Sequence, residues 1–279
     1  MYPDLKRVQE SITTFGEMIA TQGLPPSLCP MVFGFTSNGK FSVTYSGRVS
    51  QGAQKIFKLL PHEFVDPNSL DELMASPPAD CRFKVYGTVI ESHHMVKRKD
   101  ASKPFNKLEY YDHPDLYEPI FHLKYAKHMS VLVNCMFWDY KFPRVLTIQQ
   151  QKELSESGKS RLVGVCDITC DYMGSIEYLT EFTSIEDPFV VYDPIKMKVK
   201  PKINDASEGF ILYHAVDHLP AELPKEATTY FGDCLLPFLK DIILSDGTVQ
   251  FEELKDMAPE IKQAVVLYQG DLTPNYKYI

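Results

Sequence analysis

Two glycines and an acid have the types and spacing of a turn that binds phosphate and ribose. Gly47 and Gly52 bracket the start of a segment with helical periodicity, GRVSQGAQKIFKLL, and Arg48 lies between them. Free N–H groups and the dipole at a helix start attract phosphate, and a guanidinium adds a forked donor. Asp66 follows Gly47 by 19 residues, close to the ~20 expected for an acid that binds a dinucleotide ribose. The pattern is compatible with dinucleotide binding and equally with an ordinary strand-to-helix turn, because such turns begin helices in many α/β proteins.

The glycine pattern is incomplete. A full fingerprint has another glycine two positions before Gly47, where this chain has Tyr45. The preceding residues, FTSNGKFSVTY, are typical of a β-hairpin, because Asn38-Gly39 is the strongest two-residue hairpin signal. Either the turn carries a hairpin-like insertion, or the region is not a nucleotide loop.

A second group of acids lies in VCDITCDYMGSIEYLTE. Asp167 and Asp171 lie at the carboxyl end of a buried strand, where open α/β sheets bind their ligands. Glu177 and Glu181 share one face if their segment is helical. Such acids would position an amine substrate or a nicotinamide ribose. Helix capping by Asp171 or Ser175 explains the pattern equally well.

Histidines and cysteines do not form a metal site in the sequence. His93 and His94 are adjacent, point in opposite directions on an extended chain, and have no third ligand at a suitable spacing. The cysteines form no CxxC pair, and their apolar flanks predict buried, reduced thiols. The six are Cys29, Cys81, Cys135, Cys166, Cys170 and Cys234.

Strand and helix patterns alternate along the middle of the chain. This alternation predicts an α/β domain with a mostly parallel sheet, preceded by a linker helix and followed by a helical segment. The predicted strands are 31–35, 62–66, 84–90, 130–138 and 161–168, and the predicted helices include 4–22 and 47–60. The expected parts are 1–27 for the linker helix, 28–204 for the sheet domain and 205–279 for the last segment.

Composition excludes several classes of protein. The net charge is −8, with 29 basic and 37 acidic residues, which argues against nucleic acid as the main partner. No apolar run approaches the ~18–20 residues of a membrane-spanning helix. The first residues, MYPDLKRVQE, resemble neither a signal peptide nor a transit peptide.

Several blocks in order carry a family resemblance, from about residue 28 onward. VSQGAQKIFKLLPHEFVDP, KVYGTVIESHHMVKRKDA, CDITCDYMGSIEYLTEFTSIEDPF, DHLPAELPKEAT and LTPNYKYI resemble the lysine–2-oxoglutarate reductase region of the bifunctional aminoadipic semialdehyde synthases. That family is related to alanine dehydrogenase/transhydrogenase and to lysine-forming saccharopine dehydrogenase. The resemblance implies a Rossmann-like fold and the NADPH-dependent condensation of lysine with 2-oxoglutarate to saccharopine, in the mitochondrial matrix or alternatively the cytoplasm.

The resemblance also implies site residues. Gly47 and Arg48 would hold the cofactor pyrophosphate, Asp66 would lie near the adenosine ribose, and Asp167 would approach the junction of cofactor and substrate. Because an acid suits a free 2′-hydroxyl, NADH is the alternative to NADPH. The nicotinamide side and its surroundings would be lined by Asn134, Cys135, Phe137, Leu146, Thr147, Ile168 and Thr169.

Departures from the family leave other functions open. Ser37–Thr44 has the appearance of an insertion, and the family's substrate domain, with its proton-transferring lysine and histidine, is expected before this segment. Lys84, His93 and His214 lie in separate blocks and do not replace that pair. One alternative is a non-catalytic remnant, or a regulatory partner of a full-length homologue. Another is an NAD-dependent, lysine-forming saccharopine dehydrogenase.

Overall fold

The computed structural model describes residues 2–37, 47–200, 209–254 and 257–279. The chain divides into two compact units, Met1–Glu222 and Leu223–Ile279. The predicted hairpin around Asn38-Gly39, Tyr45 and most of the predicted insertion lie outside the described residues. The predicted boundary at residue 204 differs from the observed division, because residues 211–214 form a strand inside the sheet of the first unit.

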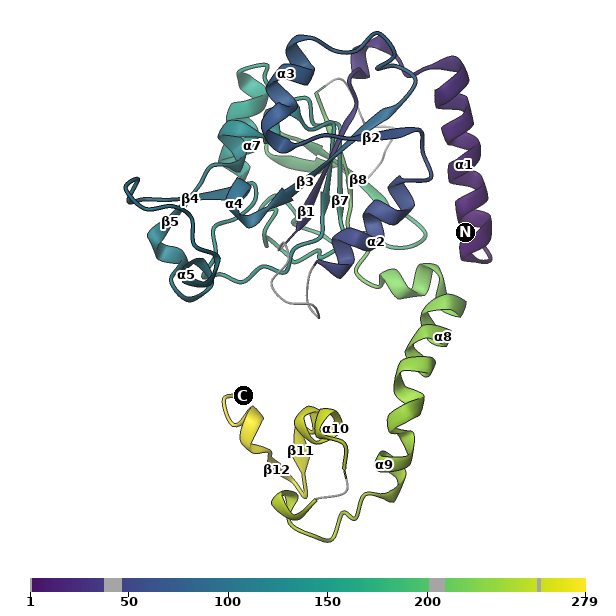
Figure 1. Cartoon of the computed structure of the whole chain (residues 1–279), viewed down its shortest axis with the longest axis vertical. Coiled ribbons are helices and arrows are strands. Elements are labelled where there is room, and N and C mark those ends of the chain that lie inside the picture. The colour runs from purple at the N-terminus through teal and green to yellow at the C-terminus, as the bar shows by residue number, and fades with distance from the viewer. Residues whose placement is uncertain (1, 38–46, 201–208, 255–256) are drawn as a thin grey trace. The chain divides into compact units, whose positions relative to one another are not determined.

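An eight-stranded sheet organises the first unit, with strand order β2-β3-β1-β6-β7-β10-β8-β9 (Figure 1). The strands from β2 to β10 in this order are parallel, and β8 and β9 complete one edge in antiparallel fashion. The predicted mostly parallel α/β architecture is confirmed. The strands are β1 (Val32–Ser37), β2 (His62–Phe64), β3 (Val85–Glu91), β6 (Val131–Asn134), β7 (Gly164–Asp167), β8 (Phe189–Asp193), β9 (Lys198–Lys200) and β10 (Ile211–His214).

Apolar side chains on both faces of the central strands explain why the sheet is covered on both sides. In β1, Val32 belongs to a core cluster on the face of α3 (Leu70–Ala75) and α7 (Ile148–Glu156). Phe35, on the opposite face, packs against Phe57 of α2 (Arg48–Phe57), with ring centroids 5.2 Å apart. Figure 1 shows α2 and α1 (Leu5–Gln22) on one side of the sheet and α3 and α7 on the other.

A polar excursion leaves the sheet between β3 and β6. It contains α4 (Ser92–Met95), α5 (Lys107–Asp112), α6 (Phe121–Lys124) and a two-stranded sheet of β4 (Val96–Arg98) and β5 (Tyr117–Pro119). Arg98 donates to both carboxylate oxygens of Glu109 at 2.8 Å. This forked ion pair joins β4 to α5.

The second unit is mostly helical, as predicted. It contains α8 (Pro224–Leu235), α9 (Leu239–Leu244), α10 (Pro259–Ala264) and a small antiparallel pair, β11 (Leu267–Tyr268) and β12 (Asp271–Leu272). No helix within the described residues combines the length and the apolar character that crossing a bilayer requires.

Most predicted elements are confirmed, and the differences have local causes. Residues 4–22 and 47–60 contain α1 and α2, and each of the five predicted strands overlaps an observed one. The segment with Glu177 and Glu181 is not helical. It runs alongside the chain before α7, where Leu146 and Ile176 form a parallel bridge, so the two acids share no helix face.

Candidate functional site

The sheet reverses its direction of growth between β1 and β6. From β1 the chain goes to β2 and β3 on one side, and then to β6 and β7 on the other. Open α/β sheets bind ligands in the crevice outside the carboxyl ends of their strands at such a switch point. The carboxyl ends of β1, β6 and β7 therefore mark the candidate site.

The amino end of α2 lies at this switch point. Gly47 is the N-cap residue and has φ of 52°, in the left-handed region that favours glycine. A Cβ on Gly47 would lie 2.6 Å from the Ser37 hydroxyl oxygen at the end of β1. In the first turn of α2, the Ser50 side chain hydrogen-bonds with Cys135, just after β6. The helix start thus contacts both strands that flank the switch point, and Arg48 is exposed there.

A buried polar network joins the ends of β1, β6 and β7. The Thr36 hydroxyl donates to Asn134 Oδ1 at 3.0 Å, and Asn134 Nδ2 donates to Asp167 Oδ1 at 2.8 Å. Asn134 Nδ2 also lies 2.8 Å from the Ser175 hydroxyl, and Tyr213 Oη donates to Asp167 Oδ2 at 2.6 Å. All five side chains are buried, so the network sets the relative positions of the strand ends.

Burial dominates the electrostatics of Asp167, which is 1% exposed. Desolvation raises its pKa to about 6, against the opposing effect of the hydrogen bonds from Tyr213 and Asn134. Burial likewise raises the pKa of the Cys135 thiol to about 12, despite the hydrogen bond with Ser50. The Asp167 carboxyl therefore serves to hold Asn134 and Tyr213 in place. The Cys135 thiol stays protonated at neutral pH.

An open pocket of about 590 Å³ lies beyond the ends of β6 and β7. Thr169 and Asp171 line it after β7, and burial and Asp217 raise the pKa of the Asp171 carboxyl. The wall from the chain after β6 is mostly aromatic and consists of Phe137, Trp138, Asp139 and Tyr140, with Tyr172 opposite. A pocket with aromatic walls and a few acids suits a flat ring and a cationic group.

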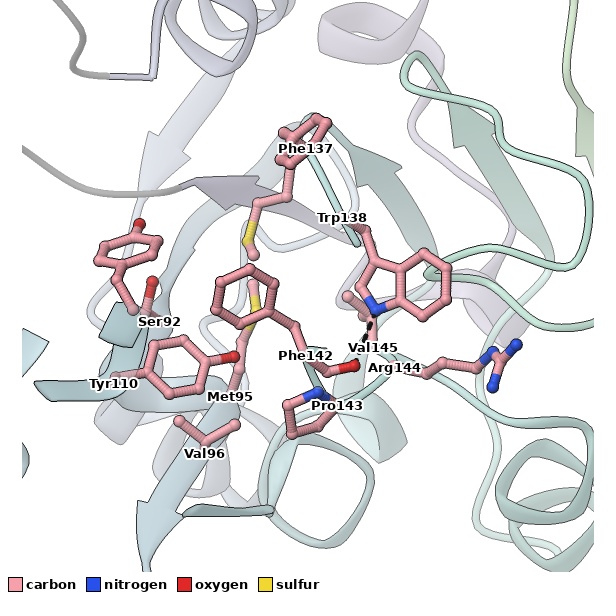
Figure 2. Close-up of a pocket in the computed structure, with 12 residues that line it drawn as sticks. Ser92, Met95, Val96, Tyr110, Phe137, Trp138, Phe142, Pro143, Arg144 and Val145 are labelled. Atoms are coloured by element: carbon pink, nitrogen blue, oxygen red, sulfur yellow. Dashed lines mark hydrogen bonds between the residues drawn. The ribbon is translucent and has the colours of Figure 1, made fainter. Parts of the chain in front are cut away.

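A smaller cavity of about 40 Å³ adjoins this pocket and shares Phe137 and Trp138 with it. Figure 2 shows the Trp138 indole N–H directed at the Phe142 carbonyl oxygen, at 3.1 Å. The Arg144 guanidinium lies 5.0 Å from the Trp138 ring centroid and donates to two carbonyl oxygens, those of Met173 and Gly174. These contacts fix the indole and make Trp138 a rigid wall.

The structure brings some of the predicted site residues together. Asn134, Asp167 and Thr169 form one group, in which Asn134 Nδ2 lies 3.2 Å from the Thr169 hydroxyl. Ser50, in the first turn of the helix that Gly47 caps, contacts Cys135 and so links the two positions.

Other predicted residues lie further from this group. Leu146 is 1% exposed, and Thr147 caps α7 by accepting from Gln150 N. Ile168 lines an apolar groove of about 510 Å³ on the α1–α2 face of the sheet. Asp66 follows β2, two strands from β1.

Three members of the network were not predicted. Thr36 could be found from the sequence, because it is the polar residue directly after the apolar run MVFGF. The sequence offers Ser175 as a helix cap, but in the structure its hydroxyl accepts a hydrogen bond from Asn134. No sequence pattern indicates Tyr213 as a site residue. Its partner Asp167 is 46 residues away, and only the pairing of β10 with β7 brings the two together.

Lys84 and His214, which could act in proton transfer, are each paired with a glutamate. Lys84 Nζ lies 2.8 Å from Glu63, and this hydrogen bond raises the pKa of the lysine. His214 Nε2 lies 3.7 Å from Glu222. His93 and His94 do not point apart as on an extended chain, because α4 brings their rings together in a tilted arrangement with centroids 3.8 Å apart. Within the described residues, no group of three or more His, Cys, Asp or Glu side chains is placed to hold a metal ion.

Comparison with known proteins finds relatives along the whole chain. An α-aminoadipic semialdehyde synthase of Arabidopsis thaliana is 41% identical over 287 aligned residues, which cover 100% of this chain and 25% of that protein. Over its whole length, the chain is similar to part of the α-aminoadipic semialdehyde synthases. The mitochondrial α-aminoadipic semialdehyde synthase of Bos taurus is 37% identical over 292 aligned residues, which cover 100% of this chain and 30% of that relative. The chain therefore spans less than a third of the length of these relatives.

A more distant similarity covers part of the chain. The NAD⁺-dependent, L-lysine-forming saccharopine dehydrogenase of Emericella nidulans is 23% identical over 133 residues, or 46% of this chain and 32% of that protein. No model of a protein family matches the chain. The resemblance to the α-aminoadipic semialdehyde synthases is thus confirmed.

Proposed function

We propose that this chain is the nicotinamide-dinucleotide-binding part of a lysine–2-oxoglutarate reductase. The supporting observation is the start of α2, which lies at the switch point of the sheet with a left-handed glycine as its N-cap. Free N–H groups at such a start bind a pyrophosphate without a dedicated side chain. The ten-residue length of α2 also gives it a helix dipole that favours the anion.

The residues around the crevice fit the two ends of such a cofactor. Gly47 and Arg48 would hold the pyrophosphate, with the exposed guanidinium as a forked donor. Asn134 and Cys135 would lie on the nicotinamide side, because Asn134 ends the strand across the switch point and Cys135 follows it. Phe137 would supply an apolar wall, since its ring is 72% exposed and lines the open pocket. When bound, the cofactor would supply the hydride, and the protein would supply position and field.

The remaining predicted residues would act by positioning. Leu146 N donates to the Ser175 carbonyl oxygen at 3.2 Å, and the Leu146 carbonyl accepts from Glu177 N at 3.0 Å. These bonds hold the Ser175 hydroxyl against Asn134. Thr147 caps α7 beside them, and Thr169 lines the open pocket. Ile168 follows Asp167 and would support the site from the α1–α2 face of the sheet. Asp167, fully engaged with Asn134 and Tyr213, would position the nicotinamide end of the site through them.

The substrates that we propose are lysine and 2-oxoglutarate, giving saccharopine. Asp171 and Asp139 in the open pocket would favour the ammonium groups of lysine. We also propose a mitochondrial location, which rests on the names of the mammalian relatives. A full-length homologue is a further partner to test.

A second candidate function is binding of the cofactor without catalysis. It is favoured by the arrangement of the titratable side chains. Asp167 is enclosed in the network, and Lys84 and His214 are paired at other places. Within the described residues, we find no free acid–base pair beside the crevice. General acid–base groups contribute typically ~10²–10⁴-fold to a rate. We therefore expect the isolated chain, given lysine, 2-oxoglutarate and NADPH, to form no saccharopine above background.

The binding experiment is a fluorescence titration of the purified chain with NADH and with NADPH. We expect saturable binding, and a loss of about tenfold or more in affinity for both cofactors in Arg48→Ala. Lys55→Ala is the matched control, because Lys55 is an exposed cation in the last turn of the same helix. Absence of binding by the folded chain, or equal losses in the two variants, would contradict the phosphate assignment.

A further inference from the structure

The strand beside β1, on the side away from the crevice, is β3 and not β2. β3 pairs with β1 along six residues, from Val32↔Tyr86 to Ser37↔Glu91, and β2 pairs only with β3. A ribose joined to a pyrophosphate at the end of β1 would lie over the neighbouring strand end. In this chain that neighbour ends in Glu91.

Glu91 lies on the face of the sheet that α2 covers. Side chains alternate along a strand, so Gly87 and Glu91 share one face. A Cβ on Gly87 would lie 2.8 Å from the Phe57 ring in α2. Ser37, which is level with Glu91 in the register, is the residue that Gly47 approaches. Glu91 and the start of α2 are therefore on the same side of the same end of the sheet.

The backbone of Glu91 is held while its carboxylate remains accessible. Its N–H donates to His94 Nδ1 at 3.1 Å, and its side chain accepts from the backbone of His94 in a capping box. Burial and the adjacent His93 lower the pKa of His94 to about 4, so this ring is a neutral acceptor at pH 7. The Glu91 side chain is 41% exposed, with His93 Nδ1 at 3.6 Å. A positioned, solvent-facing carboxylate suits a hydroxyl donor.

Asp66 has the same chemistry but a less favourable place. Strand spacing of about 4.8 Å puts the strand of Asp66 about 10 Å from β1, twice the separation of the strand of Glu91. The Asp66 carboxylate also accepts from Asn68, at 2.8 Å from the backbone nitrogen and 3.0 Å from the side-chain nitrogen. It thus closes the turn after β2.

We infer that Glu91, and not Asp66, contacts the adenosine ribose of the cofactor and makes the site prefer NADH to NADPH. A carboxylate accepts from a free 2′-hydroxyl and repels a 2′-phosphate. His93 stands beside the carboxylate and orients it. This inference rests on the proposed function, because it assigns one end of the same dinucleotide site.

The test measures dissociation constants of the whole chain for NADH and NADPH in wild type, Glu91→Gln and Asp66→Asn. Glutamine retains an acceptor oxygen for the His94 N–H, and asparagine retains one for the Asn68 N–H, so both variants remove charge and keep the local turn. Displacement by 5′-AMP and by 2′,5′-ADP reports on the ribose end alone. Circular dichroism verifies that each variant is folded.

We expect wild type to bind NADH about tenfold or more tightly than NADPH. Glu91→Gln should reduce this ratio at least about fivefold, mainly through tighter binding of NADPH and 2′,5′-ADP, whereas Asp66→Asn should change it by less than about twofold. An unchanged ratio in Glu91→Gln, an equal change in Asp66→Asn, or a wild-type preference for NADPH would overturn the inference. Absence of binding of either cofactor by the folded wild type, or equal losses in Arg48→Ala and Lys55→Ala, would instead overturn the dinucleotide site itself.

Discussion

Asp167 is the residue at which sequence and structure give different chemistry. Its place at the carboxyl end of a buried strand predicts a ligand-facing acid, yet its two carboxylate oxygens accept hydrogen bonds from Asn134 and Tyr213. Because burial disfavours the charged carboxylate, the pKa of Asp167 is raised to about 6. A buried carboxyl of this kind affects stability even where it does not touch substrate.

The first prediction concerns the pH dependence of this contribution. Because the folded pKa of Asp167 is raised above the unfolded one, near ~3.9, its contribution to stability is complete below pH ~4 and is lost as the pH rises through 6. Between pH 4 and 7 we expect the free energy of unfolding of wild type to fall by roughly 2 kcal/mol more than that of Asp167→Asn. Urea denaturation at four pH values measures this difference. Parallel pH curves for the two proteins would show that the carboxyl is not buried as described.

At the scale of the element, α2 combines two glycines with different roles. Gly47 has a positive φ, which an L side chain adopts only with strain, and lies close to Ser37. Gly52 lies inside the helix, and a Cβ there would meet nothing within 4 Å among the described residues. The backbone conformation at position 47 requires glycine, whereas glycine at position 52 lowers the stability of the helix relative to alanine.

These two glycines form a matched pair for the second prediction. Gly47→Ala should lower the free energy of unfolding by about 1–2 kcal/mol, because alanine is strained in the left-handed region. Gly52→Ala should raise it by about 0.5–1 kcal/mol, because alanine has the higher helix propensity. Chemical denaturation of both variants measures the two changes. Stabilisation by Gly47→Ala would mean that the helix begins at another residue.

At the scale of the whole molecule, the apolar core belongs to the first unit. Both core clusters, including the partly buried side chains around them, lie between Ile19 and Ala215. Among the described residues of 223–279, Leu254 is the one apolar side chain less than a tenth exposed. Stability that comes from buried apolar area therefore resides in Met1–Glu222.

The third prediction follows from this distribution. A chain ending at Glu222 should fold and keep its midpoint of thermal unfolding within about 3 °C of that of the whole chain, since the removed part contributes little core. Circular dichroism of the two chains in parallel measures the midpoints. A fall of more than about 8 °C would show that residues 223–279 stabilise the sheet unit.

The sequence by itself determined the local elements and the resemblance to known proteins. Helical periodicity predicted α1 and α2, and short apolar runs predicted β1, β3, β6 and β7, because these patterns depend on neighbours a few residues apart. The blocks that resemble the α-aminoadipic semialdehyde synthases are local strings of residues as well. Gly47 could be selected for the same reason, since the start of a helix is a local event.

Only the tertiary structure decided which strands are neighbours. The spacing rule that selected Asp66 assumes that the second strand lies beside the first, whereas β3 lies between them and brings Glu91 into that place. The network of Thr36, Asn134 and Tyr213 also joins residues far apart in sequence. Strand order depends on packing both faces of the sheet at once, and a one-dimensional pattern does not contain that information.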